Sequence, residues 1–449
     1  MPVENIGAAL EALEADDTKK VLECLENIRK AVREPLALRL ALNSKLEDLC
    51  QKCLSSGYVK LRREALLIYA DSLLSFKDNE LAADNYELVK DLLAFFKAEV
   101  LRDASRSDLF KEALDALTQW CSYGKAFRET FLVVYPVEYL KDFDVYHMPS
   151  TVLMSYVRLM RAILLQGRSR SPLFETVLNI YKKTLSYTGV TCEMVIEICG
   201  SFKGAAVEFE REDFFGVILS SRLADTLVRH VMTNVNCQRK CLNPMLALFV
   251  DCLASSNNHC KELIDQGILN VLLACLKENQ SKDVELTCRA LTNIFACSHE
   301  VLDHALRADL AKPLLFLRES FDERIREESH RALSNLFARA TPRQIFSLVE
   351  IGCVALLANL LRSRIPDVVL DGLRALFALV SATRLHDPLK LTELHRQMEA
   401  NGVKTLSESL KLHEQTEIRS LATGIYNYMA FTLDSSNGPA DEKTVISKA

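Results

Sequence analysis

A short Arg-Ala-Leu pattern recurs at nearly constant spacing in the C-terminal half of this chain. It begins three segments, Arg289–Phe295, Arg331–Phe337 and Arg374–Leu379. The fifth residues of these segments are 293, 335 and 378, so the pattern returns after 42 and then 43 residues. In each segment the apolar residues follow the period of an amphipathic helix. A recurring unit of this length is typical of solenoids, in which each unit buries its apolar face against its neighbours.

This spacing predicts an all-α fold, a right-handed superhelical solenoid of the armadillo or HEAT type, whose repeats are about 40–47 residues long. Weaker matches at residues 247–250, 161–165 and 116–119 extend the register to about nine or ten repeats within residues 1–433. We expect irregular repeats in residues 1–240 and regular ones in 241–433. Residues 130–146 break the register as an insertion, and residues 434–449 lack apolar periodicity and form a disordered tail.

Glycines at equivalent repeat positions predict sharp turns. Gly267 and Gly352 each separate a first apolar helical segment from a second one, and Gly402 offers a third instance. Glycine adopts a positive φ without strain, so each of these residues ends a short first helix and turns the chain into the next.

Composition and charge narrow the classes of function. Only 14 glycines and 11 prolines leave little material for the turns of an all-β fold. The net charge of −5 argues against nucleic acid or an anionic membrane as the partner. No run of about 18 uncharged apolar residues predicts a membrane anchor. The cysteines lie scattered in apolar helical stretches, as small hydrophobes do, so we expect a soluble cytoplasmic or nuclear protein.

Few residues are spaced for catalysis or metal binding. Cys50 and Cys53 form a CxxC pair, but no second pair matches it, and the two are predicted to pack on one helix face. Cys237, Cys241 and His230 supply three zinc ligands and lack a fourth. Nucleotide-binding and hydrolase motifs are absent. We therefore predict no enzyme activity, cofactor, metal site or small-molecule substrate.

The order of elements in residues 261–433 resembles importin-α, the armadillo adaptor that recognises nuclear localisation signals. Residues 341–354, where a helix ends in a Gly-Cys step, look like its late repeats, and residues 394–418 look like its final repeat. The resemblance implies a groove lined by a Trp and an Asn one helical turn apart on the third helix of successive repeats. The Trp side chains wall pockets for Lys or Arg stems, and the Asn amides hold the ligand backbone.

This chain departs from that pattern. The Asn positions hold Asn293 and Asn335, but the Trp positions hold Arg289 and Arg331. The single tryptophan, Trp120, falls in a register that predicts a core position. The arginine-rich arm that binds importin-β in that family has no counterpart before the predicted helices of residues 6–32. The resemblance is therefore to a divergent importin-α without the importin-β-binding arm and the Trp ladder.

We expect a binding groove for a protein or peptide partner on the concave surface, formed by Arg289, Asn293, Arg331, Asn335 and Arg374. Residues at the repeat spacing stack along a solenoid, so the arginines form a ladder suited to an acidic peptide or a carboxylate-bearing helix. Two alternatives stay open. Each arginine could pair with an acidic residue of the adjoining repeat, and each asparagine could be a tolerated polar residue or bond a neighbouring repeat.

The sequence thus predicts a non-enzymatic interaction scaffold or adaptor. The alternative is a divergent nuclear-transport adaptor that still carries cargo, favoured by the two asparagines and opposed by the missing Trp residues and basic arm. The run of alternating charge at residues 318–328 is predicted to be a solvated, ion-paired helix face.

Overall fold

The computed structural model describes most of the chain as helices. The residues it describes are 2–34, 37–38, 41, 45–74, 108–122, 128–129, 131–132, 145–164, 172–205, 211–233, 235–278, 281–350 and 353–434. No strand occurs in these ranges. Residues 133–144 of the predicted insertion and residues 435–449 of the predicted tail lie outside them.

The chain divides into two compact units, Met1–Met245 and Leu246–Ala449. The helix that carries the boundary, α15 (Val235–Leu253), contributes to both. The other helices of the first unit are α1 (Pro2–Glu14), α2 (Thr18–Ala31), α4 (Leu46–Leu54), α5 (Val59–Leu74), α7 (Asp108–Ser122), η2 (Val145–His147), α10 (Ser150–Leu164), α11 (Pro172–Leu185), α12 (Cys192–Ala205), α13 (Arg211–Ser220) and α14 (Leu223–Thr233).

Local sequence accounts for the first two of these helices. The Asp17 side chain accepts a hydrogen bond from the backbone N–H of Lys20 at 3.1 Å and so caps the start of α2. Val21, Leu25 and Ile28 follow at helical spacing and are fully buried. α1 and α2, joined by residues 15–17, are the helices predicted for residues 6–32.

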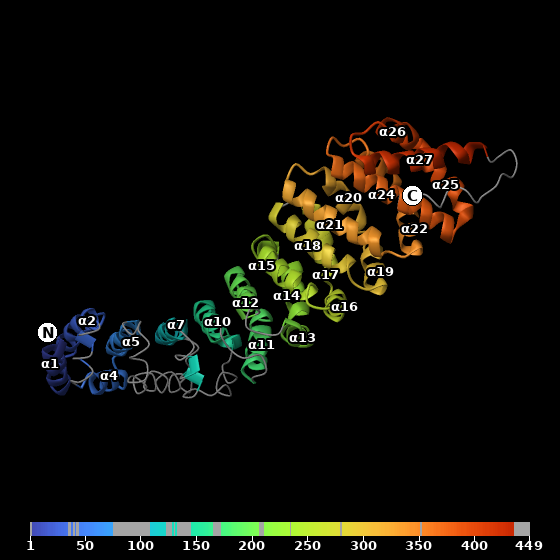
Figure 1. Cartoon of the computed structure of the whole chain (residues 1–449). Helices are drawn as coiled ribbons and strands as arrows, with labels where there is room; N and C mark the ends of the chain where they lie inside the picture. The colour runs from blue at the N-terminus through green and yellow to red at the C-terminus, as the bar shows by residue number, and fades with distance from the viewer. Residues whose placement is uncertain are drawn as a thin grey trace. The chain divides into compact units, whose positions relative to one another are not determined.

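The second unit contains four successive three-helix repeats. They are α16 (Asn257–Asp265), α17 (Ile268–Glu278) and α18 (Ser281–Phe295); α19 (His299–Arg307), α20 (Ala311–Phe316) and α21 (Glu323–Arg339), with η3 (Leu317–Glu319); α22 (Pro342–Glu350), α23 (Cys353–Leu360) and α24 (Pro366–His386); and α25 (Leu391–Ala400), α26 (Val403–Leu410) and α27 (Thr416–Asp434), preceded by η4 (Pro388–Lys390). Figure 1 shows these helices stacked in chain order. This arrangement confirms the predicted all-α solenoid and is armadillo-like.

The third helices of the repeats pack side by side, and the recurring Arg-Ala-Leu pattern lies on them. α18 contacts α21, α21 contacts α24, and α24 contacts α27. The Ala and Leu of the pattern are at most 1% exposed in every case, at Ala290, Leu291, Ala332, Leu333, Ala375 and Leu376. Burying one such leucine contributes roughly 1.5–3 kcal/mol. The sequence pattern therefore records the contact between neighbouring repeats.

Glycine allows the turn between first and second helices. Gly267 has a φ of +90° and Gly402 a φ of +72°, as predicted, and Gly352 lies outside the described residues. A Cβ built on Gly402 meets only Arg362 Nη2, at 3.8 Å, so space is available and it is the backbone conformation that favours glycine.

Gly402→Ala is expected to lower the free energy of unfolding by about 1–2 kcal/mol, because an L-residue is strained at positive φ. The matched control is Gly424→Ala in α27, where the added Cβ lies 3.9 Å from Phe377 Cε2. In a helix interior, alanine is expected to raise stability by about 0.5–1 kcal/mol. Urea denaturation measures both changes, and equal signs would contradict this account of Gly402.

Candidate binding surface on the third helices

The five residues predicted to bind a partner all lie on third helices of the second unit. Arg289 and Asn293 lie on α18, Arg331 and Asn335 on α21, and Arg374 on α24. The three arginines are exposed and the two asparagines are half-buried. Because α18 packs against α21 and α21 against α24, the five residues lie on three successive neighbouring helices. We call these five residues the third-helix surface.

Each asparagine joins its helix to the third helix before it. Asn335 Nδ2 donates to the backbone oxygen of Thr292 on α18 at 2.9 Å, and Asn293 Nδ2 donates to the backbone oxygen of Val250 on α15 at 3.2 Å. Both acceptors also take the helical bond from the residue four places on, Ala296 or Ala254. Of the alternatives for these asparagines, the structure therefore shows the bond to a neighbouring repeat.

This bond uses only part of each amide. An asparagine side chain carries two N–H donors and an acceptor oxygen. The bond to the preceding helix takes one donor and fixes the plane of the amide, which leaves one N–H and Oδ1 on a half-buried side chain. A fixed amide with a free donor and acceptor can bind the N–H and C=O of an extended peptide.

The three arginines have different partners. Arg374 forms an ion pair with Glu417 of α27, with Nε 3.1 Å from Oε1, and so bonds the adjoining repeat. Arg331 pairs within its own helix, where Nη1 lies 3.0 Å from Glu328 Oε1. Among the described residues, no hydrogen bond or ion pair involves Arg289. Pairing with the next repeat thus holds for Arg374 but not for the other two.

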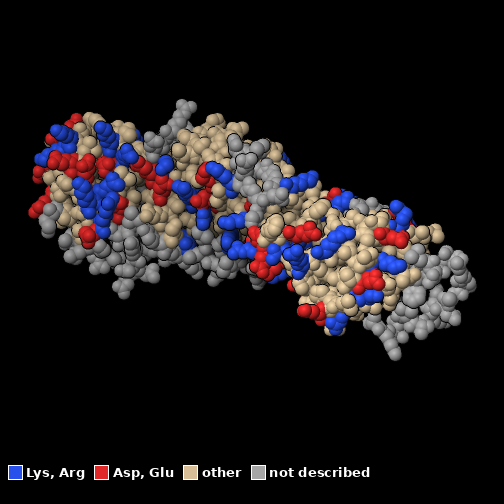
Figure 2. Space-filling view, turned by 90° about the horizontal axis from the view of Figure 1, so that it is seen from above, with Lys and Arg blue, Asp and Glu red and all other residues tan. Residues whose placement is uncertain are grey.

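Similar pairs join helices in the first unit. Arg29 of α2 lies 2.7 Å from Asp71 of α5, and Arg161 of α10 pairs with Glu197 of α12. In both pairs an arginine on one helix is neutralised by a carboxylate of another. Figure 2 accordingly shows basic and acidic side chains interspersed over the face in view. Arg289 differs from these arginines because its charge is available to a partner.

A buried charge network lies behind the third-helix surface. Arg318 Nη2 lies 2.7 Å from Asp371 Oδ2, and His330 Nδ1 lies 2.6 Å from the same oxygen. Arg318 and Asp371 are 3% and 7% exposed at the side chain. Arg318 Nη1 also donates to the backbone oxygen of Arg326 at 2.6 Å. Burial lowers the pKa of Arg318, and the Asp371 charge opposes that effect.

This network corrects one prediction. Residues 318–328 were expected to form a solvated face. Glu319, Glu323, Arg324 and Glu327 are exposed as expected, but Arg318 is buried and its partner lies on α24, in the next repeat. Alternation of charge along a sequence carries no information about a carboxylate 53 residues away.

The cysteine candidates from the sequence are buried or make single contacts where the structure describes them. Cys50 and Cys53 are buried in α4, which confirms their packing role, and Trp120 is 3% exposed, as predicted for the core. The Cys241 thiol contacts the backbone oxygen of Cys192 at 3.4 Å, and the side chain of Cys237 lies outside the described residues. Where side chains are described, no three His, Cys, Asp or Glu residues gather as metal ligands.

No single described helix is long and apolar enough to span a membrane. One pair, Pro342–Val349 with Cys353–Leu360, meets the criteria of length and composition only when taken together, and it is bent by 90°.

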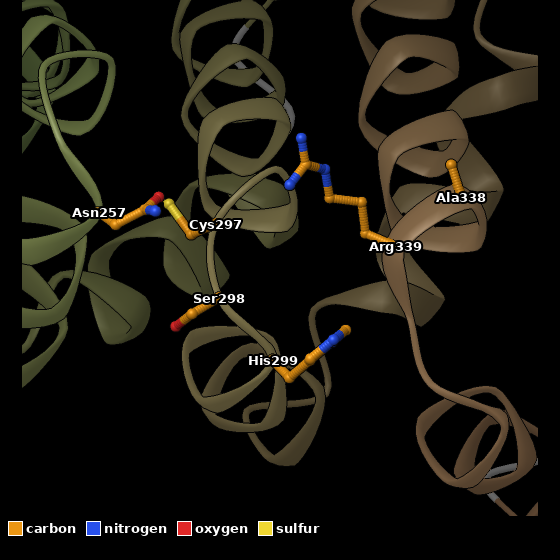
Figure 3. A pocket seen from close by; sticks show the side chains of 6 residues that line it. All are labelled: Asn257, Cys297, Ser298, His299, Ala338 and Arg339. Carbon is orange, nitrogen blue, oxygen red and sulfur yellow. The ribbon is translucent and has the colours of Figure 1, made fainter.

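A pocket opens beside the third helices, away from the predicted residues. Its volume is about 480 Å³, and it lies at the end of α18 and α21, where the chain turns into the next repeat. Figure 3 shows the Asn257 amide beside the Cys297 sulfur, and the Arg339 side chain extending into the same space. Sequence analysis did not single out this site.

Comparison with known proteins supports the fold. No protein-family model matches the chain, and no curated protein matches its sequence. The crystal structure of an engineered protein superposes with a TM-score of 0.56 and 18% identity over 95% of this chain and 99% of that one. At this identity the likeness shows a shared fold only.

Designed armadillo repeat proteins are also similar over part of the chain. One, solved in complex with the peptide (KR)4, has a TM-score of 0.43 and 17% identity, covering 56% of this chain and 99% of that one. Another, designed for modular peptide recognition, has a TM-score of 0.43 and 18% identity, covering 56% and 98%. The resemblance to importin-α stays a prediction.

Asn335→Ala is expected to lower the free energy of unfolding by about 0.5–1.5 kcal/mol, because it removes the bond from α21 to Thr292. Ser334→Ala, at the neighbouring half-buried position, is the matched control and should change stability by less than about 0.5 kcal/mol. Chemical denaturation of the two variants compares them, and an equal effect would show that the asparagine bond contributes nothing.

Asp371→Asn should lower the free energy of unfolding by about 3–5 kcal/mol, because it leaves the Arg318 charge buried without a carboxylate. Arg374→Gln removes the half-exposed pair with Glu417 and should cost less than about 1 kcal/mol. The midpoints of thermal unfolding of the two variants test this order. A larger loss of stability for Arg374→Gln would show that the pair with Glu417, and not the buried pair of Arg318 with Asp371, contributes more.

Proposed function

We propose that this chain is a non-enzymatic scaffold that holds an extended, acidic segment of a partner protein on the third-helix surface. The observation that carries the proposal is the pair of residues repeated on neighbouring helices, Arg289 with Asn293 and Arg331 with Asn335. Four residues separate the members of each pair, so both point to the same side of their helix.

The two residue types supply complementary interactions. The asparagine amides, fixed by their bonds to Val250 and Thr292, offer a donor and an acceptor to a peptide backbone. The exposed arginines offer charge-assisted bonds to carboxylates. Neighbouring helices lie roughly 8–10 Å apart and an extended chain rises about 3.3 Å per residue, so the matching carboxylates would be two or three residues apart.

The arginines of this surface support an acidic rather than a basic ligand. Arg289 has no carboxylate partner among the described residues, and Arg331 is held only by Glu328 of its own helix. A basic segment at these positions would meet like charge, which is unfavourable. We therefore favour a partner other than a nuclear localisation signal, and we make transport of a basic cargo an outcome of the test.

The test uses two fluorescent peptides, (Glu-Ser)4 and (Lys-Arg)4, and fluorescence anisotropy with the full chain. The wild-type protein should bind the acidic peptide more tightly, and this binding should weaken as salt rises. Replacing Arg289, Arg331 and Arg374 by Glu should weaken it by about tenfold or more and should improve binding of the basic peptide.

The matched control changes three exposed arginines on the first helices of successive repeats, Arg307, Arg343 and Arg396, to Glu. This variant has the same net charge but an intact third-helix surface. Equal loss in both variants would show a nonspecific charge effect, and tighter wild-type binding of (Lys-Arg)4 would favour the cargo adaptor. Pull-down with the wild type, the third-helix variant and the control variant then identifies the partner. Only the third-helix variant should lose it.

A further inference from the structure

Two cysteines far apart in the sequence meet beside the end of α18, next to the pocket. Cys260 lies on α16 and Cys297 lies two residues beyond the end of α18. Their Sγ atoms are 2.7 Å apart, which is only about 0.7 Å longer than a disulfide bond. All cysteines that the structure describes carry free thiols, so this pair is a dithiol.

The two thiols differ in access. Cys260 is fully buried, and its Sγ also contacts the backbone oxygen of Leu253 at 3.3 Å. Cys297 is 9% exposed and lines the pocket of about 480 Å³ together with Arg339. A small reagent in the pocket therefore reaches Cys297 first (Figure 3), and the buried Cys260 sulfur lies 2.7 Å from the Cys297 sulfur.

The two thiols also differ in acidity. The hydrogen bond with Cys260 lowers the pKa of Cys297, the Arg339 charge lowers it further, and burial opposes both. The same hydrogen bond, together with burial, raises the pKa of Cys260. By contrast, burial raises the pKa of Cys288, on the same helix, to about 12. The accessible sulfur is thus the one that more readily becomes a thiolate, which is the nucleophilic form.

We propose that Cys260 and Cys297 form a redox-active dithiol that a peroxide oxidises to an intramolecular disulfide. The Cys297 thiolate attacks one peroxide oxygen, the O–O bond breaks, and the hydroxide that leaves takes up the Cys297 proton as water. Cys297 is then a sulfenic acid. The Cys260 sulfur attacks it, the S–S bond forms, the S–O bond breaks, and the second hydroxide leaves with the Cys260 proton as water. Two thiols lose two electrons and the peroxide gains them.

The disulfide would tie two helices of one repeat together. α16 is the first helix of its repeat, and Cys297 begins the connection from α18 to α19. The bond closes a loop of 37 residues. This site is separate from the third-helix surface, so its chemistry does not depend on the proposed scaffold function.

The test treats the reduced full-length protein with a few equivalents of hydrogen peroxide, blocks the remaining thiols with N-ethylmaleimide, and maps the peptides by mass spectrometry. The expected result is a cross-link of Cys260 to Cys297, formed before any other of the 14 cysteines reacts and reversed by dithiothreitol. Oxidation of other cysteines first, or a cross-link of Cys297 to Cys252, would overturn the proposal.

Three variants separate the steps. Cys260→Ser should stop the reaction at a Cys297 sulfenic acid that dimedone traps, and Cys297→Ser should leave Cys260 unmodified. Arg339→Gln should slow oxidation by about two- to fivefold. Cys288→Ala is the matched control and should form the cross-link at the wild-type rate. Circular dichroism checks that each variant is folded, and the wild-type peptide map decides the question even where a variant is not.

Discussion

The contact between neighbouring third helices is the constraint on which the second unit depends. A three-helix repeat has an apolar side that it cannot cover by itself, so the third helices pack in succession and the alanine and leucine of the pattern are buried in each of three of them. The alanines allow the helices to approach closely, and the leucines fill the space between them. The neighbouring positions are less buried, so polar residues can recur there: Arg289 is exposed, and Asn293 uses its amide to bond the helix before it.

The sequence predicted the packing positions on the third helices because the same contact recurs in successive repeats. Ala290 and Leu291 can be recognised as core residues because the residues 42 and 85 positions later show the same pattern. Gly267 was predictable for a similar reason, since its equivalents Gly352 and Gly402 stand at the same repeat position, although the turn between α19 and α20 has Asp309 at a φ of +55° instead. The irregular first unit offered no such comparison, so its helix bounds came only from local caps such as Asp17.

What the sequence could not predict are contacts made only once. Arg318 stands in a run of alternating charge, and its burial depends on Asp371, which belongs to another repeat. The partners of the arginines were undetermined for the same reason: Arg374 meets Glu417 of the next helix, whereas Arg331 meets Glu328 of its own. A periodic sequence specifies which side of a helix a residue occupies, but the identity of its neighbour depends on residues that do not repeat.

The cysteines show how the two kinds of information combine. Taken singly, Cys260 and Cys297 are small apolar residues in a core, as the sequence indicated, yet the fold places their sulfur atoms 2.7 Å apart. Cys297 also contacts the backbone oxygen of Asn293, one turn earlier, whose amide bonds Val250. The sulfurs therefore lie one turn beyond an amide that joins α18 to the helix before it, so a covalent bond there would act next to a contact between repeats.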